Sequence, residues 1–176
     1  MHAHFPHGKS ESKRLWCVMA LIELTDIPAQ VGREQRLMGL DLGSKTIGLA
    51  LSDILLSVAS PLETIRRSKF TKDAERLIAL IHEHDVGVLV LGMPLEMDGT
   101  EGKRCQSTRD FALNLAKLHD IPVVLWDERL STSAVERMLV DDVDMTRKRR
   151  SEVIDKLAAT YILQGALDAL AHRTKS

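Results

Sequence analysis

Three strand-like runs follow one another at short intervals after residue 36, and this arrangement restricts the fold more than any other feature of the chain. The runs are RLMGLDLG, TIGLALSD and ASPLETIRR, and a Gly-Ser-Lys turn at residues 43–45 joins the first two. Consecutive strands with short connections pair in antiparallel orientation. The sequence therefore predicts a three-stranded antiparallel meander.

Helical and strand-like segments alternate in the rest of the chain. Thr71 is expected to cap a helix whose apolar residues follow helical spacing. The continuous apolar runs VGVLVLGMP and IPVVLWDE are typical of buried parallel strands. Further helices are expected over residues 104–119, from Ser133 to Val140, and after a basic loop that ends at residue 150. This order predicts an α/β domain with a mixed five-stranded sheet, the meander at one side and the parallel strands at the other, flanked by helices.

The composition restricts the classes of protein to which the chain can belong. Hydrophobic residues make up 44% and aromatic residues only 3%, so we expect an aliphatic core. The formal net charge of -1 gives no overall indication of nucleic-acid binding, so local basic clusters must provide it. Cys17 and Cys105 suit a reduced compartment. No apolar run approaches the ~20 residues of a membrane span, and we expect a cytoplasmic protein with no membrane partner.

The first 36 residues differ from the remainder of the chain. Their start is polar, rich in histidine and without periodicity. A basic segment before the apolar run at residues 15–22 imitates a secretion signal, but no convincing cleavage site follows. We expect a partly disordered N-terminal extension over residues 1–36, within which Met19 is an alternative start to Met1, and a single domain over residues 37–173.

A carboxylate, Asp41, interrupts the first strand-like run. Alternation places it on the face opposite Met38 and Leu40, among glycines, and the second run presents Gly48 and Ala50 in the same way. An unpaired carboxylate within a strand is costly. Either Asp41 accepts backbone hydrogen bonds at the turn, or it belongs to a site that another group approaches across these small residues.

Further acids lie at the end of the last strand-like run and on the final helix. Asp127 and Glu128 follow a buried strand, where ligands gather in open α/β sheets, and alternation does not choose between them. Asp155 lies at the edge of the apolar stripe of the final helix, beside small alanines. A salt bridge to Arg129, a helix cap or an ion pair with a neighbouring base would explain each acid alone.

Together, carboxylates from three separate elements indicate a site for divalent cations. Asp and Glu are hard oxygen ligands of Mg²⁺ and Mn²⁺, and such clusters hold two ions about 4 Å apart for phosphodiester cleavage. The scattered histidines form no zinc-type cluster, and no Gly-x-Ser-x-Gly elbow supports a serine nucleophile. We expect a metal-dependent phosphodiesterase that uses Mg²⁺ or Mn²⁺, with two ions.

Four motifs resemble, in order, those of the YqgF/RuvX family of ribonuclease H-like proteins: GLDLGSKTIGLALSD, VLGMPLEMDGTEG, VVLWDERLST and KRRSEVIDKLAATYILQGAL. The resemblance implies a ribonuclease H-like fold with a catalytic and metal-binding triad, carried over as Asp41, Glu128 and Asp155. It selects Glu128 over Asp127. It also implies a nuclease that matures the 5′ end of pre-16S ribosomal RNA, related by fold to Holliday-junction resolvases.

Basic residues lie near each of these acids in the sequence and are the expected contacts to phosphate. Lys45 follows Asp41, and Arg129 follows Glu128. The remaining candidates are Arg147, Lys148, Arg149, Arg150 and Lys156. A solvated loop balanced by nearby acids is the alternative for the basic stretch.

Other functions remain open on the sequence. A resolvase of four-way DNA junctions would use the same carboxylates but needs a symmetric dimer, and we see no obvious dimer helix, so we expect a monomer or a weak homodimer. A catalytically silent ribosome-assembly factor would not need buried carboxylates. The first hairpin also resembles that of actin-like ATPases, which need a second subdomain. Structured RNA, specifically pre-16S rRNA, and ribosomal particles are the expected partners, and only the resemblance favours RNA.

Overall fold

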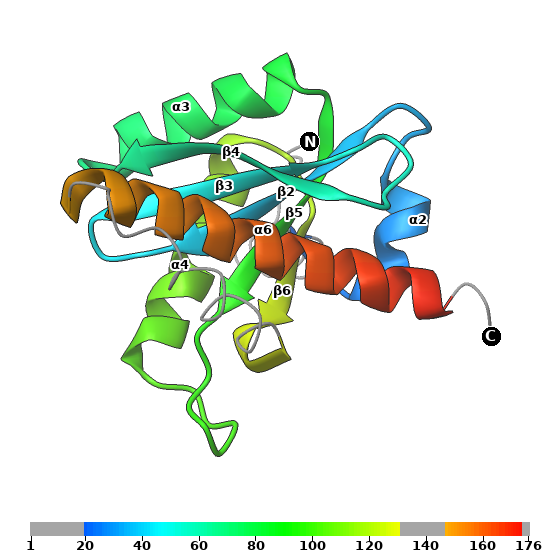
Figure 1. Cartoon of the computed structure of the whole chain (residues 1–176). Coiled ribbons are helices and arrows are strands. Elements are labelled where there is room, and N and C mark those ends of the chain that lie inside the picture. Colours follow the sequence, from blue (N-terminus) through cyan, green and yellow to red (C-terminus); the bar gives the residue numbers. More distant parts are fainter. Residues whose placement is uncertain (1–19, 131–146, 174–176) are drawn as a thin grey trace, which may run out of the picture.

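The computed structural model describes residues 20–130 and 147–173, which form one sheet with helices on both faces (Figure 1). Its elements are β1 (Leu21–Ile22), η1 (Leu24–Asp26), α2 (Ile27–Gln30), β2 (Arg36–Leu42), β3 (Thr46–Ser52), β4 (Ala59–Arg66), α3 (Phe70–Glu83), β5 (Val86–Met93), α4 (Lys103–Leu118), β6 (Val123–Asp127), η2 (Glu128–Leu130) and α6 (Arg147–Arg173). The strand order is β1-β6-β5-β2-β3-β4.

The pairing of the strands confirms the predicted α/β class with a mixed sheet. β2, β3 and β4 pair in antiparallel orientation, as the short turns between them require. β5 lies parallel to β2, and β6 lies parallel to β5. An antiparallel meander followed by parallel strands, each preceded by a helix, is the ribonuclease H-like order that the family resemblance implied.

The sheet has six strands instead of the five predicted, because the chain before residue 37 contributes one. Leu21 and Ile22 pair in parallel with Val123 and Val124 of β6. Ile27 of α2 is fully buried. A two-residue strand is too short for periodicity to reveal. The described part of the predicted extension is thus packed into the domain, and residues 1–19 lie outside the described residues.

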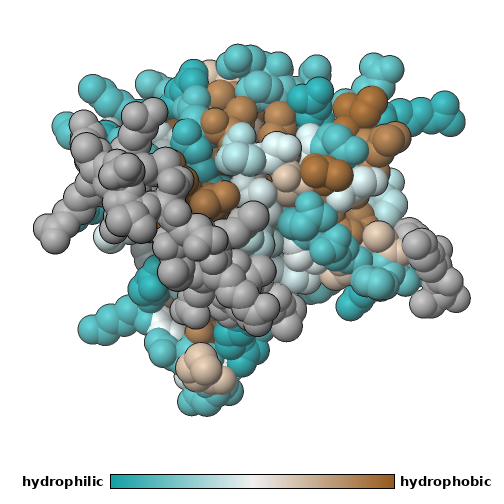
Figure 2. Space-filling model, in the orientation of Figure 1, coloured by the Kyte–Doolittle hydropathy of each residue, from teal (hydrophilic) through white to brown (hydrophobic). Residues whose placement is uncertain are grey.

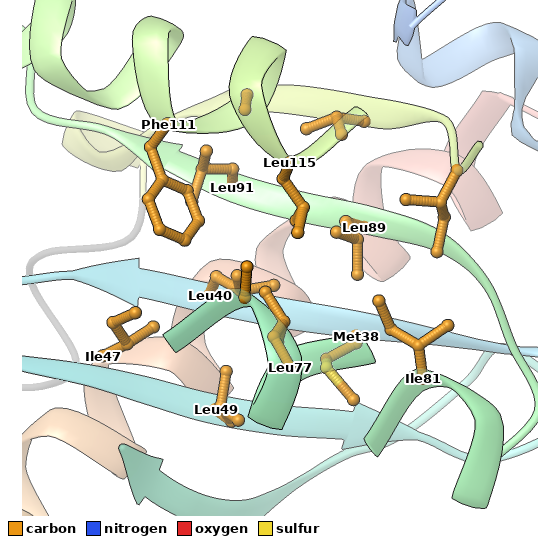
Figure 3. Close-up of a cluster of buried hydrophobic side chains, with 14 of the residues drawn as sticks. Met38, Leu40, Ile47, Leu49, Leu77, Ile81, Leu89, Leu91, Phe111 and Leu115 are labelled. Carbon is orange, nitrogen blue, oxygen red and sulfur yellow. The ribbon is translucent and has the colours of Figure 1, made fainter. Parts of the chain in front are cut away.

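Alternating side chains of the central strands form a separate core on each face of the sheet. On one face, Leu40 of β2 packs with Leu77 of α3 and Leu115 of α4 (Figure 3). On the other, Leu37 of β2 packs with Leu163 of α6. Both cores are mainly aliphatic, as the composition predicts. The α6 face is the one that carries Asp41.

The helix α3 begins earlier than predicted. Its first residue is Phe70, and Lys69 rather than Thr71 is the N-cap residue. The Asp73 carboxylate accepts hydrogen bonds from the backbone N–H and the hydroxyl of Ser68, at 3.0 and 3.2 Å. The predicted cap was therefore wrong, because a carboxylate in the first turn binds the preceding loop and Thr71 does not cap the helix.

The final helix also begins earlier than predicted. α6 starts at Arg147, so residues 147–150 are helical and do not belong to the expected basic loop. The helix runs along the face formed by β2, β3 and β4 (Figure 1). Within the described ranges, no helix has the length and apolar character needed to cross a membrane. The predicted helix from Ser133 to Val140 lies outside the described residues.

Exposed apolar side chains gather in the turn between β3 and β4. Ile54, Leu55 and Val58 are 48%, 79% and 56% exposed. Figure 2 shows apolar surface at the end of the molecule where this turn lies. Asp41 pairs with Gly48, nearer the other end of the β2–β3 hairpin. The apolar turn is therefore separate from the predicted carboxylate site.

Candidate active site

Asp41 lies near the end of β2 and pairs with Gly48 across the antiparallel ladder. Its side chain is partly buried, and no donor among the described residues hydrogen-bonds to its carboxylate. Burial, followed by the negative charge of Asp155, raises the pKa of Asp41 to about 6 against the opposing charge of Arg104. A cap for the following turn would accept backbone hydrogen bonds, so the structure does not support that alternative.

A direct backbone contact between α6 and β3 sets the position of Asp155. A Cβ on Gly48 would lie 2.0 Å from the carbonyl oxygen of Asp155, so the helix rests on the strand itself. Thr46 Oγ1 also donates a hydrogen bond of 2.8 Å to Asp155 Oδ2. A Cβ on Gly39 would similarly meet the carbonyl oxygen of Ala159 at 2.8 Å. The small residues of this face therefore admit the helix that carries Asp155.

Glu128 directly follows β6, and its side chain lies over the neighbouring strand β5. A Cβ on Gly92 would lie 2.5 Å from Glu128 Oε1, so a glycine in this strand makes room for the carboxylate. Burial, then the charge of Asp41, raises the pKa of Glu128 to about 7, and Arg104 again opposes the shift. Added positive charge is therefore favourable between Asp41 and Glu128.

Asp127 takes a different role from Glu128. Arg129 donates to it from the backbone N–H at 3.0 Å and from the guanidinium at 2.6 Å. The side-chain hydrogen bond from Arg129 is the main cause that holds the pKa of Asp127 below its usual value. Asp127 thus forms a local ion pair, whereas Glu128 is affected by the charge of Asp41, and the catalytic role of Glu128 stays a prediction.

The three predicted acids are electrostatically coupled, with Asp41 in the middle of the series. Asp155 affects the pKa of Asp41, and Asp41 affects that of Glu128. Among the described residues, however, no three acidic, histidine or cysteine side chains are gathered tightly enough to hold a metal ion as they stand. The arrangement is an open cluster with Asp155 already fixed by Thr46.

A cleft of about 520 Å³ lies beside Glu128. Its walls come from the loop after β5, the start of α4 and the segment after β6. The lining residues are Pro94, Leu95, Glu96, Met97, Arg104, Glu128 and Arg129. The cleft therefore connects one predicted catalytic acid to solvent and brings two arginines to it.

The structure brings only some of the predicted basic residues to the acids. Arg129 lines the cleft but is paired with Asp127. Lys45 is exposed in the β2–β3 turn, and Lys156 is partly exposed on α6. Residues 147–150 form the first turn of α6, and their side chains lie outside the described part of the structure.

Three residues of the site were missed in the sequence. Gly92 lies within β5 and accommodates the side chain of Glu128. The sequence did offer an indication for Gly92, because a glycine inside a continuous apolar strand often marks a place where another group approaches closely. No pattern in the sequence indicated that Thr46 and Arg104 belong to the site, because the residues that they approach are distant in the chain.

Comparison with known proteins identifies the family. A family model described as RuvX, Holliday junction resolvase, matches residues 35–169. A "Putative pre-16S rRNA nuclease" of Paramagnetospirillum magneticum is 61% identical over 150 residues, which span 85% of this chain and 96% of that protein. A protein of the same name from Rhodospirillum rubrum is 62% identical over 133 residues, spanning 76% and 83%.

A solved structure is also among the matches. Thermus thermophilus RuvC in complex with a Holliday junction substrate is 15% identical with a TM-score of 0.49, and the similarity covers 80% of this chain and 96% of RuvC. The family match and the nuclease names of the relatives confirm the predicted hydrolase class, a nuclease. The chain belongs to the RuvX family.

Proposed function

We propose that this protein is a divalent-metal-dependent nuclease that hydrolyses phosphodiester bonds in structured RNA and matures the 5′ end of pre-16S rRNA. The observation that carries the proposal is the pair Asp41 and Glu128. Both carboxylates are partly buried and close enough for one to raise the pKa of the other, and neither accepts a hydrogen bond from the described residues. Such a pair is costly unless a cation or a proton compensates it.

The chemistry of this donor set fits Mg²⁺ or Mn²⁺. The available ligands are carboxylate oxygens, which hard divalent cations prefer. Asp41 and Glu128 would hold the metal, with Asp155 as a third ligand from α6. When bound, two such ions supply an activated water and stabilise the leaving oxygen in phosphodiester hydrolysis.

The protein itself contributes position and burial. The β2–β3 ladder fixes Asp41, and the hydrogen bond from Thr46 orients Asp155. The absence of a side chain at Gly92 allows Glu128 to lie over β5. The three acids therefore come from two strand ends and a packed helix, elements that hold their backbone in place.

RNA is proposed as the substrate because relatives at 61% and 62% identity carry the pre-16S rRNA nuclease name. The description of the family model supports a second candidate, cleavage of four-way DNA junctions. Both substrates need the same hydrolysis at the carboxylates. The surface that positions the nucleic acid must therefore distinguish them.

The direct test incubates the purified protein with a labelled RNA spanning the 5′ end of 16S rRNA and with a synthetic four-way DNA junction. Each is assayed with Mn²⁺, with Mg²⁺ and with EDTA. We expect metal-dependent cleavage of the RNA, and Asp41→Asn should abolish it while retaining the wild-type circular dichroism spectrum. Cleavage of the junction alone would establish the second candidate. Cleavage of neither substrate, or equal activity in EDTA, would overturn the proposal.

A further inference from the structure

We propose that Arg104 binds a phosphodiester group of the nucleic-acid backbone at the edge of the acidic site. This inference rests on the proposed nuclease function and adds to it a substrate contact outside the predicted set of basic residues. Arg104 lies in the first turn of α4, and its side chain lines the same cleft as Glu128.

The position of Arg104 couples it to two acids at once. Its charge acts on Asp41 of β2 and on Glu128 of η2, two residues that are distant in the sequence. Even so, the described residues offer it neither a hydrogen bond nor an ion pair through its side chain. Arg104 is therefore near the carboxylates without being bound to them, and its guanidinium donors remain available.

Two neighbouring arginines, unlike Arg104, form ion pairs with acidic side chains. Arg129, across the cleft, is held by Asp127 through its backbone and its guanidinium. Arg109, on the next turns of α4, forms an ion pair with Glu101. These local pairs use the donors that a phosphate would need. Within the described part of the cleft, Arg104 is thus the cation best suited to receive an external anion.

The backbone beneath Arg104 is firmly anchored. The next residue, Cys105, is fully buried, and its thiol donates to the carbonyl oxygen of Pro94 at 3.3 Å. The buried Thr108 hydroxyl donates to the carbonyl oxygen of Arg104 at 2.9 Å. An exposed guanidinium on a fixed helical turn loses less freedom on binding than one on a loose loop.

Arginine also has the geometry that this task requires. Its planar guanidinium donates two parallel hydrogen bonds to the oxygens of a phosphate, which lysine does not reproduce. A phosphodiester brings negative charge toward Asp41 and Glu128, and Arg104 offsets the resulting repulsion. A purely structural counter-ion would instead form a direct salt bridge with one of the acids.

The test compares Arg104→Gln and Arg104→Lys with Lys103→Gln, which removes one charge from the exposed neighbouring position outside the lining of the cleft. Binding of a fluorescein-labelled RNA spanning the 5′ end of 16S rRNA is followed by fluorescence anisotropy over a range of salt concentrations. Ca²⁺ is present to neutralise the acids. Circular dichroism and thermal unfolding establish that each variant is folded.

We expect Arg104→Gln to weaken RNA binding roughly tenfold and to reduce the salt slope by about 1, as the loss of one phosphate contact should. Arg104→Lys should keep the salt slope and lose part of the affinity, and Lys103→Gln should bind within about twofold of the wild type. Unchanged affinity and slope in Arg104→Gln, or equal losses in Arg104→Gln and Lys103→Gln, would overturn the assignment. If the wild-type protein cleaves nothing but Arg104→Gln still shows this loss, the nuclease proposal fails and the phosphate contact stands.

Discussion

The carbonyl oxygen of Asp155 occupies the space beside Gly48 into which a side chain would project, only 2.0 Å from where a Cβ would be. Gly48 is also the partner of Asp41 in the β2–β3 ladder. One glycine thus brings a helix carboxylate and a strand carboxylate together. The site depends on a backbone contact as much as on its acids.

Gly48→Ala should destabilise the fold severely. The atom that a Cβ would meet is backbone on a packed helix, so neither side can move without separating α6 from β3. Overpacking of this kind typically costs about 1–3 kcal/mol, and this contact is closer than any real Cβ contact, so we expect the upper end or more. Urea unfolding of the variant and the wild type measures the loss.

Gly32→Ala is the matched control for this change. The nearest atom to a Cβ there is Oε1 of the Gln35 side chain, at 3.2 Å, and this flexible group can turn away. Its free energy of unfolding should stay within about 1 kcal/mol of the wild type. Equal stability of Gly48→Ala and Gly32→Ala would contradict the close contact.

The faces of the central strands could be predicted from the sequence, because alternation in β2 and β3 is a local property. The same alternation placed Asp41 opposite Leu40, and the structure agrees. Alternation alone could not separate the roles of Glu128 and Asp127, because the difference depends on the hydrogen bond that Arg129 donates to Asp127. The position of Arg104 near Asp41 could not be predicted either, because it results from packing between elements that are distant in the sequence.

Gly92→Ala should reduce cleavage through Glu128. A Cβ at this position would press on Glu128 Oε1 and on Cδ1 of Ile162, both at 2.5 Å. We expect the carboxylate to be displaced and kcat to fall at least tenfold, with a smaller loss of stability of about 1–3 kcal/mol from the contact with Ile162.

The control for Gly92→Ala is Gly102→Ala, whose Cβ would approach only Oε1 of the exposed Glu96 side chain, at 2.9 Å. Single-turnover cleavage at saturating Mn²⁺ and urea unfolding should be compared for both variants. If Gly92→Ala retains wild-type kcat, Glu128 does not act from the position that this glycine provides.

The metal-free protein should lose stability as the pH rises from about 4 to about 7. The pKa of Asp41 rises on folding from 3.8 to about 6, and that of Glu128 from 4.5 to about 7. Within this range the folded state binds more protons than the unfolded state, so the free energy of unfolding falls with increasing pH. After discounting for solvent access, the combined change is of order 2 kcal/mol.

Asp41→Asn isolates this effect from the other titrating groups. In EDTA at pH 7 the variant should be more stable than the wild type, and the difference should disappear near pH 4. Saturating Mn²⁺ should reverse the order at pH 7, since the metal binds the ionised wild-type cluster. Thermal unfolding across this pH range gives the measurement, and a constant difference at every pH would be inconsistent with the raised pKa values.

Substitution of the adjacent acids should separate their roles. Glu128→Gln removes the carboxylate that faces Asp41, and we expect cleavage to fall at least a hundredfold, as is common when a group that supports the transition state is lost. Asp127→Asn breaks a partly exposed ion pair with Arg129, which contributes about 1 kcal/mol or less to stability. Its kcat should remain within about threefold of the wild type. The reverse order of activities would assign the catalytic role to Asp127.

Thr46→Val should lower activity without a large change in stability. The substitution retains the β-branched shape but removes the hydroxyl that donates to Asp155 Oδ2 at 2.8 Å. This hydrogen bond is only partly buried, so its loss should cost about 1 kcal/mol of stability, and Asp155 then samples other rotamers. We expect roughly a tenfold loss of kcat and weaker Mn²⁺ binding, since partners that orient metal ligands commonly contribute this much.

Thr160→Val removes a comparable hydroxyl that donates to the carbonyl oxygen of Lys156 within α6, and it should leave both quantities unchanged. Isothermal titration with Mn²⁺ and single-turnover kinetics distinguish the two variants, and equal effects would mean that Thr46 does not orient Asp155.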